Sequence, residues 1–237
     1  MSAPPRVYIE AKIAPDTRIS LAPDDAHYLR DVMRLAVGGT VRVFNGDSGE
    51  FECTVESAGK RDFIARAIRQ LRAPCKEIRG IELAFAPIRH ARLDFLFEKA
   101  AELGATVLSP VLTSRTAVKN FNPDHAKSVV KEAVEQCGRL TLPTINPLIT
   151  LEKFIAAREH KRTLVFLDER ESARTNDTRK LASADTILIG PEGGFSPDEF
   201  ALLESAGAIG VHLQGTILRA ETAAITALAL HTFKEEK

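Results

Sequence analysis

Two hydrophobic periodicities divide the chain. Over roughly the first 70 residues, short runs rich in β-branched and aromatic residues predict β-strands at 6–13, within 40–58 and at 62–71. The sequence Gly-Asp-Ser-Gly at 46–49 predicts a turn that splits the run 40–58 into two strands. These segments predict a small β-rich unit.

One helix is expected inside this unit, over residues 24–39. Asp24 or Asp25 suits its N-cap, and the glycine pair at 38–39 suits its end. Helical spacing would place four apolar residues on one face of this helix, namely Leu29, Val32, Met33 and Ala36.

From residue 81 onward, apolar runs alternate with segments of helical periodicity. Strands are expected at 81–87, 106–111, 163–168, 186–190 and 209–214, and helices at 93–104, 122–138, 151–159, 196–207 and 221–236. This alternation predicts an α/β domain built on a parallel sheet. We therefore expect a β-rich domain over 1–72, a linker over 73–80 and the α/β domain over 81–237.

Composition narrows the classes of protein. The three cysteines are far apart and form no metal-binding or disulfide pattern, so neither a metal nor a disulfide is expected. No signal peptide or membrane-spanning run is present, which makes the cytoplasm the expected location. Net charge is zero, but residues 163–237 carry 7 basic and 12 acidic side chains, whereas residues 76–162 carry 14 and 10. This distribution permits a basic face elsewhere on the chain.

The loop after the strand at 186–190 carries unusual chemistry. Gly190-Pro191-Glu192-Gly193-Gly194 is followed by Ser196, Pro197 and Glu199, which predict a helix with a capping box. The glycines allow a ligand to approach the backbone closely. No P-loop or dinucleotide motif is present, and Glu192 would repel a phosphate. The loop better suits a ligand with hydroxyls, amines or a positive centre, such as an adenosine carrying a sulfonium; a capped turn without ligand is the alternative.

A second loop follows the strand at 209–214. There Ile217 and Leu218 offer backbone groups that suit an adenine edge, or else they fill the core. Arg219 and Glu221 flank the start of the next helix. Because ligands bind beyond the carboxyl ends of parallel strands, we expect these loops and the strand end at 167–169 to form one site.

The sequence resembles the RsmE family, uracil-N3 methyltransferases of 16S ribosomal RNA within the SPOUT superfamily. The resemblance rests on "IGPEGGFSPDEF" and "ILRAETAAITAL", on "FEKAAELGATVLSPVLTSRT" and "EAVEQCGRLTLPTI", and on Arg6 with "HYLRDVMRLAVGG". It spans essentially the whole chain. One departure is Gln214, which stands where the family usually has glycine, with Gly215 following it.

The resemblance implies an N-terminal PUA-like β-barrel that binds RNA and a C-terminal SPOUT α/β domain with a trefoil knot. It implies a homodimer formed through the knot domain, a partner in 16S rRNA of the small ribosomal subunit, and S-adenosylmethionine as cofactor. The absence of a long apolar run separately argues against a membrane partner. The cofactor-binding residues it implies are Leu167, Glu169, Ile189, Gly190, Pro191, Glu192, Gly193, Gly194, Leu213, Gln214, Ile217, Leu218, Arg219, Thr222 and Ala223.

Methylation of uracil N3 requires loss of a proton and stabilisation of the resulting anion. We expect Arg219 to stabilise that anion, with Arg115 from the partner subunit as second candidate. Glu221 and Glu192 are candidate proton acceptors, although Glu221 also suits the first turn of a helix. RNA-binding candidates are Arg6, His27, Arg30, Arg34 and Arg115, and an ordinary solvated face is the alternative for the group on the helix. A 2′-O-methyltransferase and a non-catalytic RNA-binding assembly factor are the rival functions.

Overall fold

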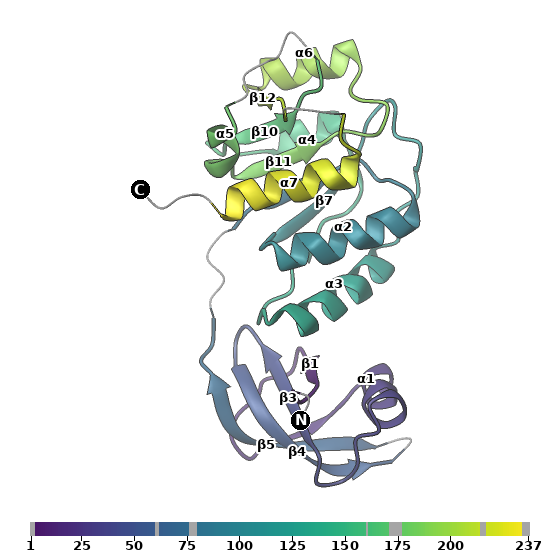
Figure 1. Ribbon diagram of the computed structural model, residues 1–237, viewed down its shortest axis with the longest axis vertical. Helices are drawn as coiled ribbons and strands as arrows, with labels where there is room; N and C mark the ends of the chain where they lie inside the picture. The colour runs from purple at the N-terminus through teal and green to yellow at the C-terminus, as the bar shows by residue number, and fades with distance from the viewer. Residues whose placement is uncertain are drawn as a thin grey trace. The chain divides into compact units, whose positions relative to one another are not determined.

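The computed structural model describes residues 3–59, 62–75, 80–159, 161–170, 177–213 and 217–233. The chain forms two compact units. One unit contains the described residues of Met1–Ile78 together with Val134–Thr141, and the other contains those of Arg79–Ala133 and Leu142–Lys237. Figure 1 traces both units along the chain.

The N-terminal unit is a curled five-stranded sheet of order β1-β3-β4-β5-β2. Its strands are β1 (Arg6–Tyr8), β2 (Arg18–Ser20), β3 (Thr40–Asn45), β4 (Gly49–Ala58) and β5 (Phe63–Arg72). The predicted strands at 40–58 and 62–71 and the turn at 46–49 are confirmed. The run at 6–13 is a strand only as far as Tyr8, and β2 was not predicted. Alternating residues such as Val41, Val43 and Cys53 are fully buried and form the core of this unit.

The helix expected over 24–39 is shorter than predicted. It consists of α1 (Pro23–His27), continued by one π-helical turn, η1 (Tyr28–Val32). Ala22 is the N-cap and no side chain caps the helix, so the capping role expected of Asp24 or Asp25 is wrong. Arg34 takes a left-handed φ of 55°, which ends the helix well before the glycine pair. The expected apolar face is also wrong: Leu29 is buried, but Val32 is 61% exposed.

A buried ion-pair network joins residues 134–141 to the N-terminal strands. Glu50 is 2% exposed and accepts from Arg6 Nε at 2.9 Å, and Arg72 and Arg42 lie at 3.5 and 3.9 Å from its carboxylate. The other guanidinium nitrogens of Arg6 donate to the carbonyls of Val134, Glu135 and Arg139. These contacts explain why residues 134–141 belong to this unit.

The C-terminal unit is built on an entirely parallel sheet of order β12-β10-β11-β6-β7-β8, with β9 pairing to β7. Its strands are β6 (Glu82–Phe85), β7 (Val107–Leu112), β8 (Thr144–Ile145), β9 (Ile149–Thr150), β10 (Leu164–Leu167), β11 (Thr186–Ile189) and β12 (Ile209–Val211). All five predicted strands are present, which confirms the α/β class. The short strands β8 and β9 were not predicted, because two residues carry no periodicity.

Helices cover both faces of this sheet. They are α2 (His90–Glu102), α3 (Pro123–Cys137), α4 (Leu151–Ala157), α5 (Arg179–Ala182), α6 (Pro197–Ser205) and α7 (Ala220–Thr232), of which only α5 was not predicted. Ala84 belongs to the core that α4 and α6 form with the sheet. Its neighbour Phe85 points to the opposite face and contacts Phe97 of α2. On that face α2 lies beside α7 (Figure 1).

Along the described ranges, no helix combines the length and apolar character that crossing a bilayer requires.

Candidate functional site

Three neighbouring strands of the C-terminal sheet end at the same edge. β12, β10 and β11 are adjacent and parallel, and they end at Val211, Leu167 and Ile189. The loops that follow these strands therefore meet beyond their carboxyl ends. The structure thus brings together the three segments that the sequence marked.

The loop after β11 is a tight turn joined directly to a capped helix. Gly194 donates its N–H to the carbonyl of Pro191 at 2.9 Å and takes a φ of 66°. A Cβ on Gly194 would lie 2.0 Å from Glu169 Oε1, and one on Gly190 would lie 2.9 Å from the Phe195 ring. The capping box of Ser196 and Glu199 is present as predicted. The backbone of this loop therefore packs closely against Glu169 and Phe195, and its shape depends on glycine.

These loops enclose a pocket of about 460 Å³. Its lining consists of Leu167, Asp168, Glu169, Ile189, Gly190, Pro191, Glu192, Gly193, Gly194, Val211, His212, Leu213, Ile217, Leu218, Arg219, Ala220 and Ala223. Most of the expected cofactor-binding residues are among them. Thr222 is not, because it lies on an exposed side of α7, and Gln214 lies outside the described residues.

Asp168 and His212 also line the pocket. Asp168 lies in the strand end at 167–169 that was expected to join the site, whereas His212 was not expected there. Asp168 is 2% exposed and binds the guanidinium of Arg170, which also reaches Glu204 and stacks on Phe200. The hydrogen bond to Asp168 raises the pKa of Arg170 further above its ordinary value. His212 Nδ1 lies 2.9 Å from the Asp168 carbonyl, so Nδ1 carries the proton. This second contact joins residues 44 apart and leaves no local sequence signal.

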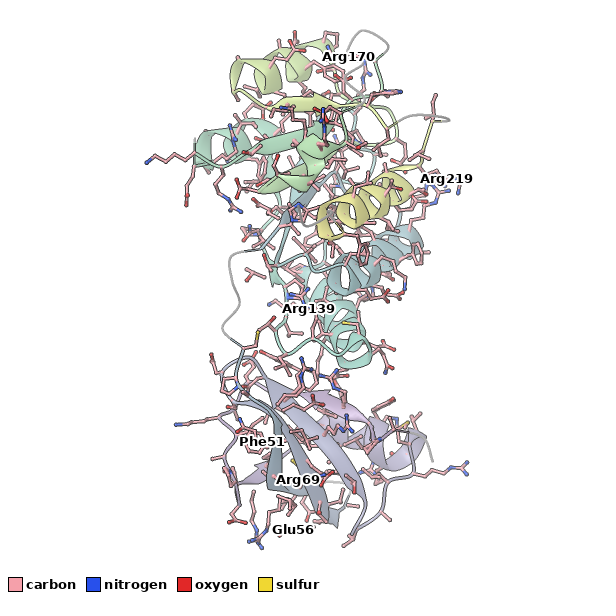
Figure 2. The ribbon with its side chains drawn as sticks, turned by 60° about the vertical axis from the view of Figure 1, so that its left-hand side comes forward. Phe51, Glu56, Arg69, Arg139, Arg170 and Arg219 are labelled. Carbon is pink, nitrogen blue, oxygen red and sulfur yellow. The ribbon has the colours of Figure 1, made fainter. Side chains whose placement is uncertain are left out.

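Arg219 and Ile217 stand at the open side of the pocket. Arg219 is the exposed N-cap residue of α7 (Figure 2), and among the described residues its guanidinium has no hydrogen bond or ion pair. Ile217 is 94% exposed. Covering an isoleucine side chain contributes about 1.5–3 kcal/mol, so this residue favours a ligand with an apolar face.

Glu221 faces away from the pocket. It is buried, and its Oε1 lies 3.6 Å from Arg92 Nε of the neighbouring helix α2. Its Oε2 is buried and has no hydrogen-bond partner among the described residues. Glu192, by contrast, is exposed in the pocket loop.

Arg115 lies at the rim of the same pocket. It belongs to a turn, Thr113–Thr116, that follows β7 and is closed by a hydrogen bond from Thr113 N to Thr116 Oγ1. Arg115 Nη1 donates to the Gly193 carbonyl of its own chain at 2.9 Å. The resemblance led us to expect this arginine at the pocket of the partner subunit.

The RNA-binding candidates on the predicted helix at 24–39 do not form one row of cations. Arg30 donates to the Asp31 carboxylate and to the Gly59 carbonyl, and His27 Nδ1 lies 2.6 Å from Asp31. The hydrogen bond from Arg30 lowers the pKa of Asp31 to about 2. Arg34 lies beyond the end of the helix, so the expected face shared with Arg30 is absent.

Arg6 is bound inside the protein. Its side chain is 12% exposed and its guanidinium makes four hydrogen bonds to Glu50 and to backbone carbonyls. The guanidinium of Arg6 is therefore engaged within the N-terminal unit, an arrangement that does not favour the expected contact with RNA.

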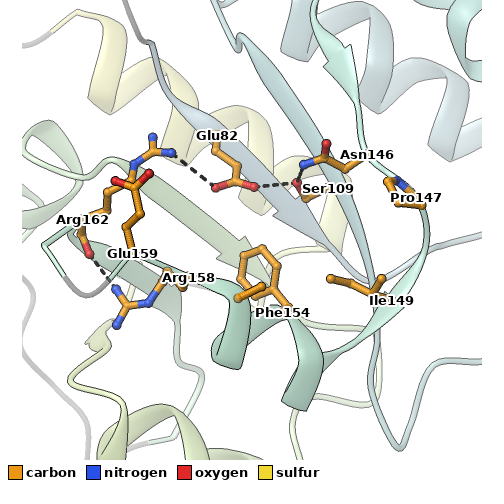
Figure 3. A pocket seen from close by; sticks show the side chains of 10 residues that line it. Glu82, Ser109, Asn146, Pro147, Ile149, Phe154, Arg158, Glu159 and Arg162 are labelled. Atoms are coloured by element: carbon orange, nitrogen blue, oxygen red, sulfur yellow. Dashed lines mark hydrogen bonds and ion pairs between the residues drawn. The ribbon is translucent and has the colours of Figure 1, made fainter.

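A second cavity, of about 240 Å³, lies at the opposite edge of the C-terminal sheet (Figure 3). Glu82, at the start of β6, accepts from Ser109 and from Thr186, and Ser109 accepts from Asn146. These polar groups satisfy one another across three strands and a loop. Their arrangement is that of a structural network. The described residues hold no group of three or more His, Cys, Asp or Glu side chains arranged for a metal ion.

The fold and site define a two-unit protein whose C-terminal parallel α/β unit carries a glycine-lined pocket at its strand ends. Family models match both units: an RNA methyltransferase domain over residues 76–232 and an RNA methyltransferase PUA domain over residues 21–68. The chain belongs to this RNA methyltransferase family, the RsmE family.

Individual relatives agree along nearly the full length. Ribosomal RNA small subunit methyltransferase E of Rickettsia conorii is 36% identical over 230 residues, which are 94% of this chain and 93% of that protein. A methyltransferase from Legionella pneumophila, solved with bound S-adenosylmethionine, superposes with a TM-score of 0.87 at 28% identity and covers 97% of both chains. Ribosomal RNA small subunit methyltransferase E from Neisseria gonorrhoeae, also bound to S-adenosylmethionine, gives 0.83 at 25% identity and covers 96% of both.

Proposed function

We propose that this protein transfers the methyl group of S-adenosylmethionine to N3 of a uridine in 16S rRNA of the small ribosomal subunit. The observation that carries the proposal is the pocket at the ends of β10, β11 and β12 in a chain of the RsmE family. Two relatives of the same fold are named as S-adenosylmethionine complexes.

The pocket suits this cofactor in shape and chemistry. Its glycine loop presents backbone groups at close range, and its wall includes apolar residues such as Leu213 and Ile217. Glu169 and Glu192 place negative charge where a sulfonium would be favoured and a phosphate repelled. We assign cofactor binding to the predicted residues that line the pocket, and Thr222 and Gln214 remain predictions.

The bound cofactor supplies an electrophilic methyl group, and the protein's own residues must orient and deprotonate the uracil. Arg219 can donate to the forming uracil anion, because its guanidinium is exposed at the pocket opening and carries no other partner among the described residues. For the proton acceptor we favour Glu192 over Glu221. Glu192 is exposed in the pocket loop, whereas Glu221 is buried against Arg92.

The wider assembly is proposed on the resemblance and on exposed apolar side chains. Phe95 of α2 is 45% exposed and Phe233, just after α7, is 75% exposed. These side chains support a homodimer formed through the C-terminal domain. On the resemblance we further propose that this domain is knotted, that the PUA-like unit over 1–72, joined through 73–80, helps to bind RNA, and that the protein acts in the cytoplasm. His27 and Arg34, which are exposed, and Arg30 are the remaining N-terminal candidates for RNA contact.

The test is methylation of small subunits purified from cells that lack the gene. The wild-type chain should add one methyl group per subunit, and mass spectrometry of digested rRNA should place it on N3 of a uracil. A methyl group on a ribose 2′-hydroxyl would replace this proposal with the 2′-O reaction. Absence of S-adenosylmethionine binding by calorimetry would favour a non-catalytic assembly factor.

A further inference from the structure

A single buried carboxylate links two loops of the candidate site. Glu199, in the first turn of α6, is 6% exposed. Its Oε1 accepts from Ser114 N at 2.6 Å, and its Oε2 accepts from Ser114 Oγ at 3.0 Å and from Ser196 N at 2.8 Å. A capping box needs only the last of these contacts. The two bonds to Ser114 join segments that are 85 residues apart.

The residue after Ser114 contacts the loop that lines the pocket. Arg115 Nη1 donates to the carbonyl of Gly193 in the pocket loop. A Cβ on Gly193 would lie 3.5 Å from Arg115 Cβ, which places the two residues side by side. Arg115 is exposed, and among the described residues its guanidinium makes no hydrogen bond besides the one to Gly193. A long side chain at a surface has many rotamers, and fixing its backbone reduces the conformations it must give up on binding.

We propose that Glu199 is a positioning residue of the methyl-transfer site. It clamps the 113–116 turn to the start of α6 and so holds Arg115 at the pocket rim, where the free N–H groups of the guanidinium contact the RNA substrate. This inference rests on the proposed function, because methylation of rRNA is what supplies the RNA that Arg115 contacts.

The discriminating variant is Glu199→Gln. The carboxylate faces three donors, whereas an amide keeps one acceptor oxygen and turns an NH₂ group toward a donor. The turn should be released while the volume of the side chain is kept. Ser196→Ala is the matched control, since it removes the cap of α6 but leaves both bonds from Ser114 to Glu199 in place.

Steady-state methylation of small subunits should show that Glu199 acts through Arg115. We expect Glu199→Gln to lower kcat/KM by about 10- to 100-fold. In an Arg115→Ala background the same change should lower it by less than about twofold, because the effects of coupled residues do not add. In a Ser196→Ala background, Arg115→Ala should lower kcat/KM as much as it does in the wild-type chain. Affinity for S-adenosylmethionine should fall no further in Glu199→Gln than in Ser196→Ala.

Hydrogen exchange gives a readout that needs no turnover. The Ser114 amide should be protected in the wild-type chain and in Ser196→Ala, and should exchange faster in Glu199→Gln. Unchanged protection in Glu199→Gln, or an equal loss of kcat/KM with and without Arg115, would overturn the positioning role. A wild-type chain that transfers no methyl group would instead overturn the proposed function, so the two failures are distinguishable.

Discussion

At the scale of single residues, Arg219 is the candidate whose role is most directly measurable. Arg219→Ala removes the only pocket-lining arginine among the described residues, and we expect kcat for small subunits to fall about 10²-fold, as for loss of a donor to a developing anion. Affinity for S-adenosylmethionine, measured by calorimetry, should change little, because the loop backbones remain.

Arg179→Ala is the control for this experiment. Arg179 is an arginine of α5 that is paired with Asp177 and does not line the pocket. Near-normal turnover by Arg219→Ala with intact cofactor binding would remove Arg219 from the mechanism.

The three cysteines should differ in reactivity. Burial raises the pKa of Cys53 to about 11, whereas Cys75 and Cys137 are exposed. The reactive species is the thiolate, and a raised pKa keeps Cys53 a thiol until the pH approaches that value. Iodoacetamide at pH 8 should therefore alkylate two cysteines of the folded chain and all three in denaturant, as counted by mass spectrometry. Rapid labelling of Cys53 in the folded chain would show that the core of β4 opens.

The sequence identified much of the candidate site at this scale and missed what depends on distant partners. The segments 190–194 and 217–219 could be recognised from the sequence, because clustered glycines and apolar residues are unusual in loops at strand ends. Glu199 was recognisable as a capping residue, but its bonds to Ser114 require the fold. Likewise, no local pattern indicates that Arg6 is engaged by carbonyls about 130 residues away.

At the scale of elements, the loop between β11 and α6 depends on a left-handed glycine. Gly194→Ala should cost about 1 kcal/mol of stability, since a Cβ at this φ is strained and would press on Glu169. Gly207, after α6, is a matched control with a φ of 73° and open space around it. Gly207→Ala should show the cost of the left-handed φ alone, and should lower the unfolding temperature no more than Gly194→Ala does.

The two variants should separate in cofactor binding. Only Gly194→Ala should weaken S-adenosylmethionine binding, because only that loop lines the pocket. Calorimetric titration of both variants checks this expectation. Equal affinities would mean that the loop shape is not what binds the cofactor.

Elements with strong periodicity were predictable, and the failure at 24–39 has a physical reason. Apolar residues at helical spacing normally mark a buried face, but here the π-helical turn and the left-handed Arg34 end the helix early. Val32 and Val37 consequently stand in solvent at 61% and 64% exposure. An amphipathic pattern cannot reveal this, because it records spacing and not where the backbone leaves the helix.

At the scale of the whole molecule, the N-terminal unit is completed by a segment from far along the chain. Residues 134–141 lie within a region whose helical pattern gives no sign that its end packs on the N-terminal strands. Beyond the carbonyls that bind Arg6, Glu135 accepts from Tyr8 N at 2.9 Å and Gly138 accepts from Arg72 at 2.6 Å. The unit is therefore discontinuous in sequence.

This discontinuity predicts that a fragment ending at Cys75 will not fold stably. Each bond from a charged donor contributes about 1.5–3 kcal/mol, and the fragment loses the three from Arg6 to Val134, Glu135 and Arg139. That loss is comparable with the total stability of about 5–15 kcal/mol of a small domain. The fragment should show no cooperative thermal transition by circular dichroism.

Arg6→Ala in the full chain tests the same contacts without truncation. It leaves Glu50 as a buried carboxylate that has lost its nearest cation, and should cost about 3–5 kcal/mol in urea unfolding. The exposed pair Arg69–Glu52 in the same sheet is the control, and Arg69→Ala should cost less than about 1 kcal/mol. A fragment 3–75 that unfolds cooperatively would show that the N-terminal strands are stable without residues 134–141. An Arg6→Ala chain as stable as Arg69→Ala would show that the bonds of Arg6 do not stabilise the unit. If the fragment folds, the RNA binding that we propose for this unit can be tested apart from the rest of the chain; if the prediction holds, it cannot.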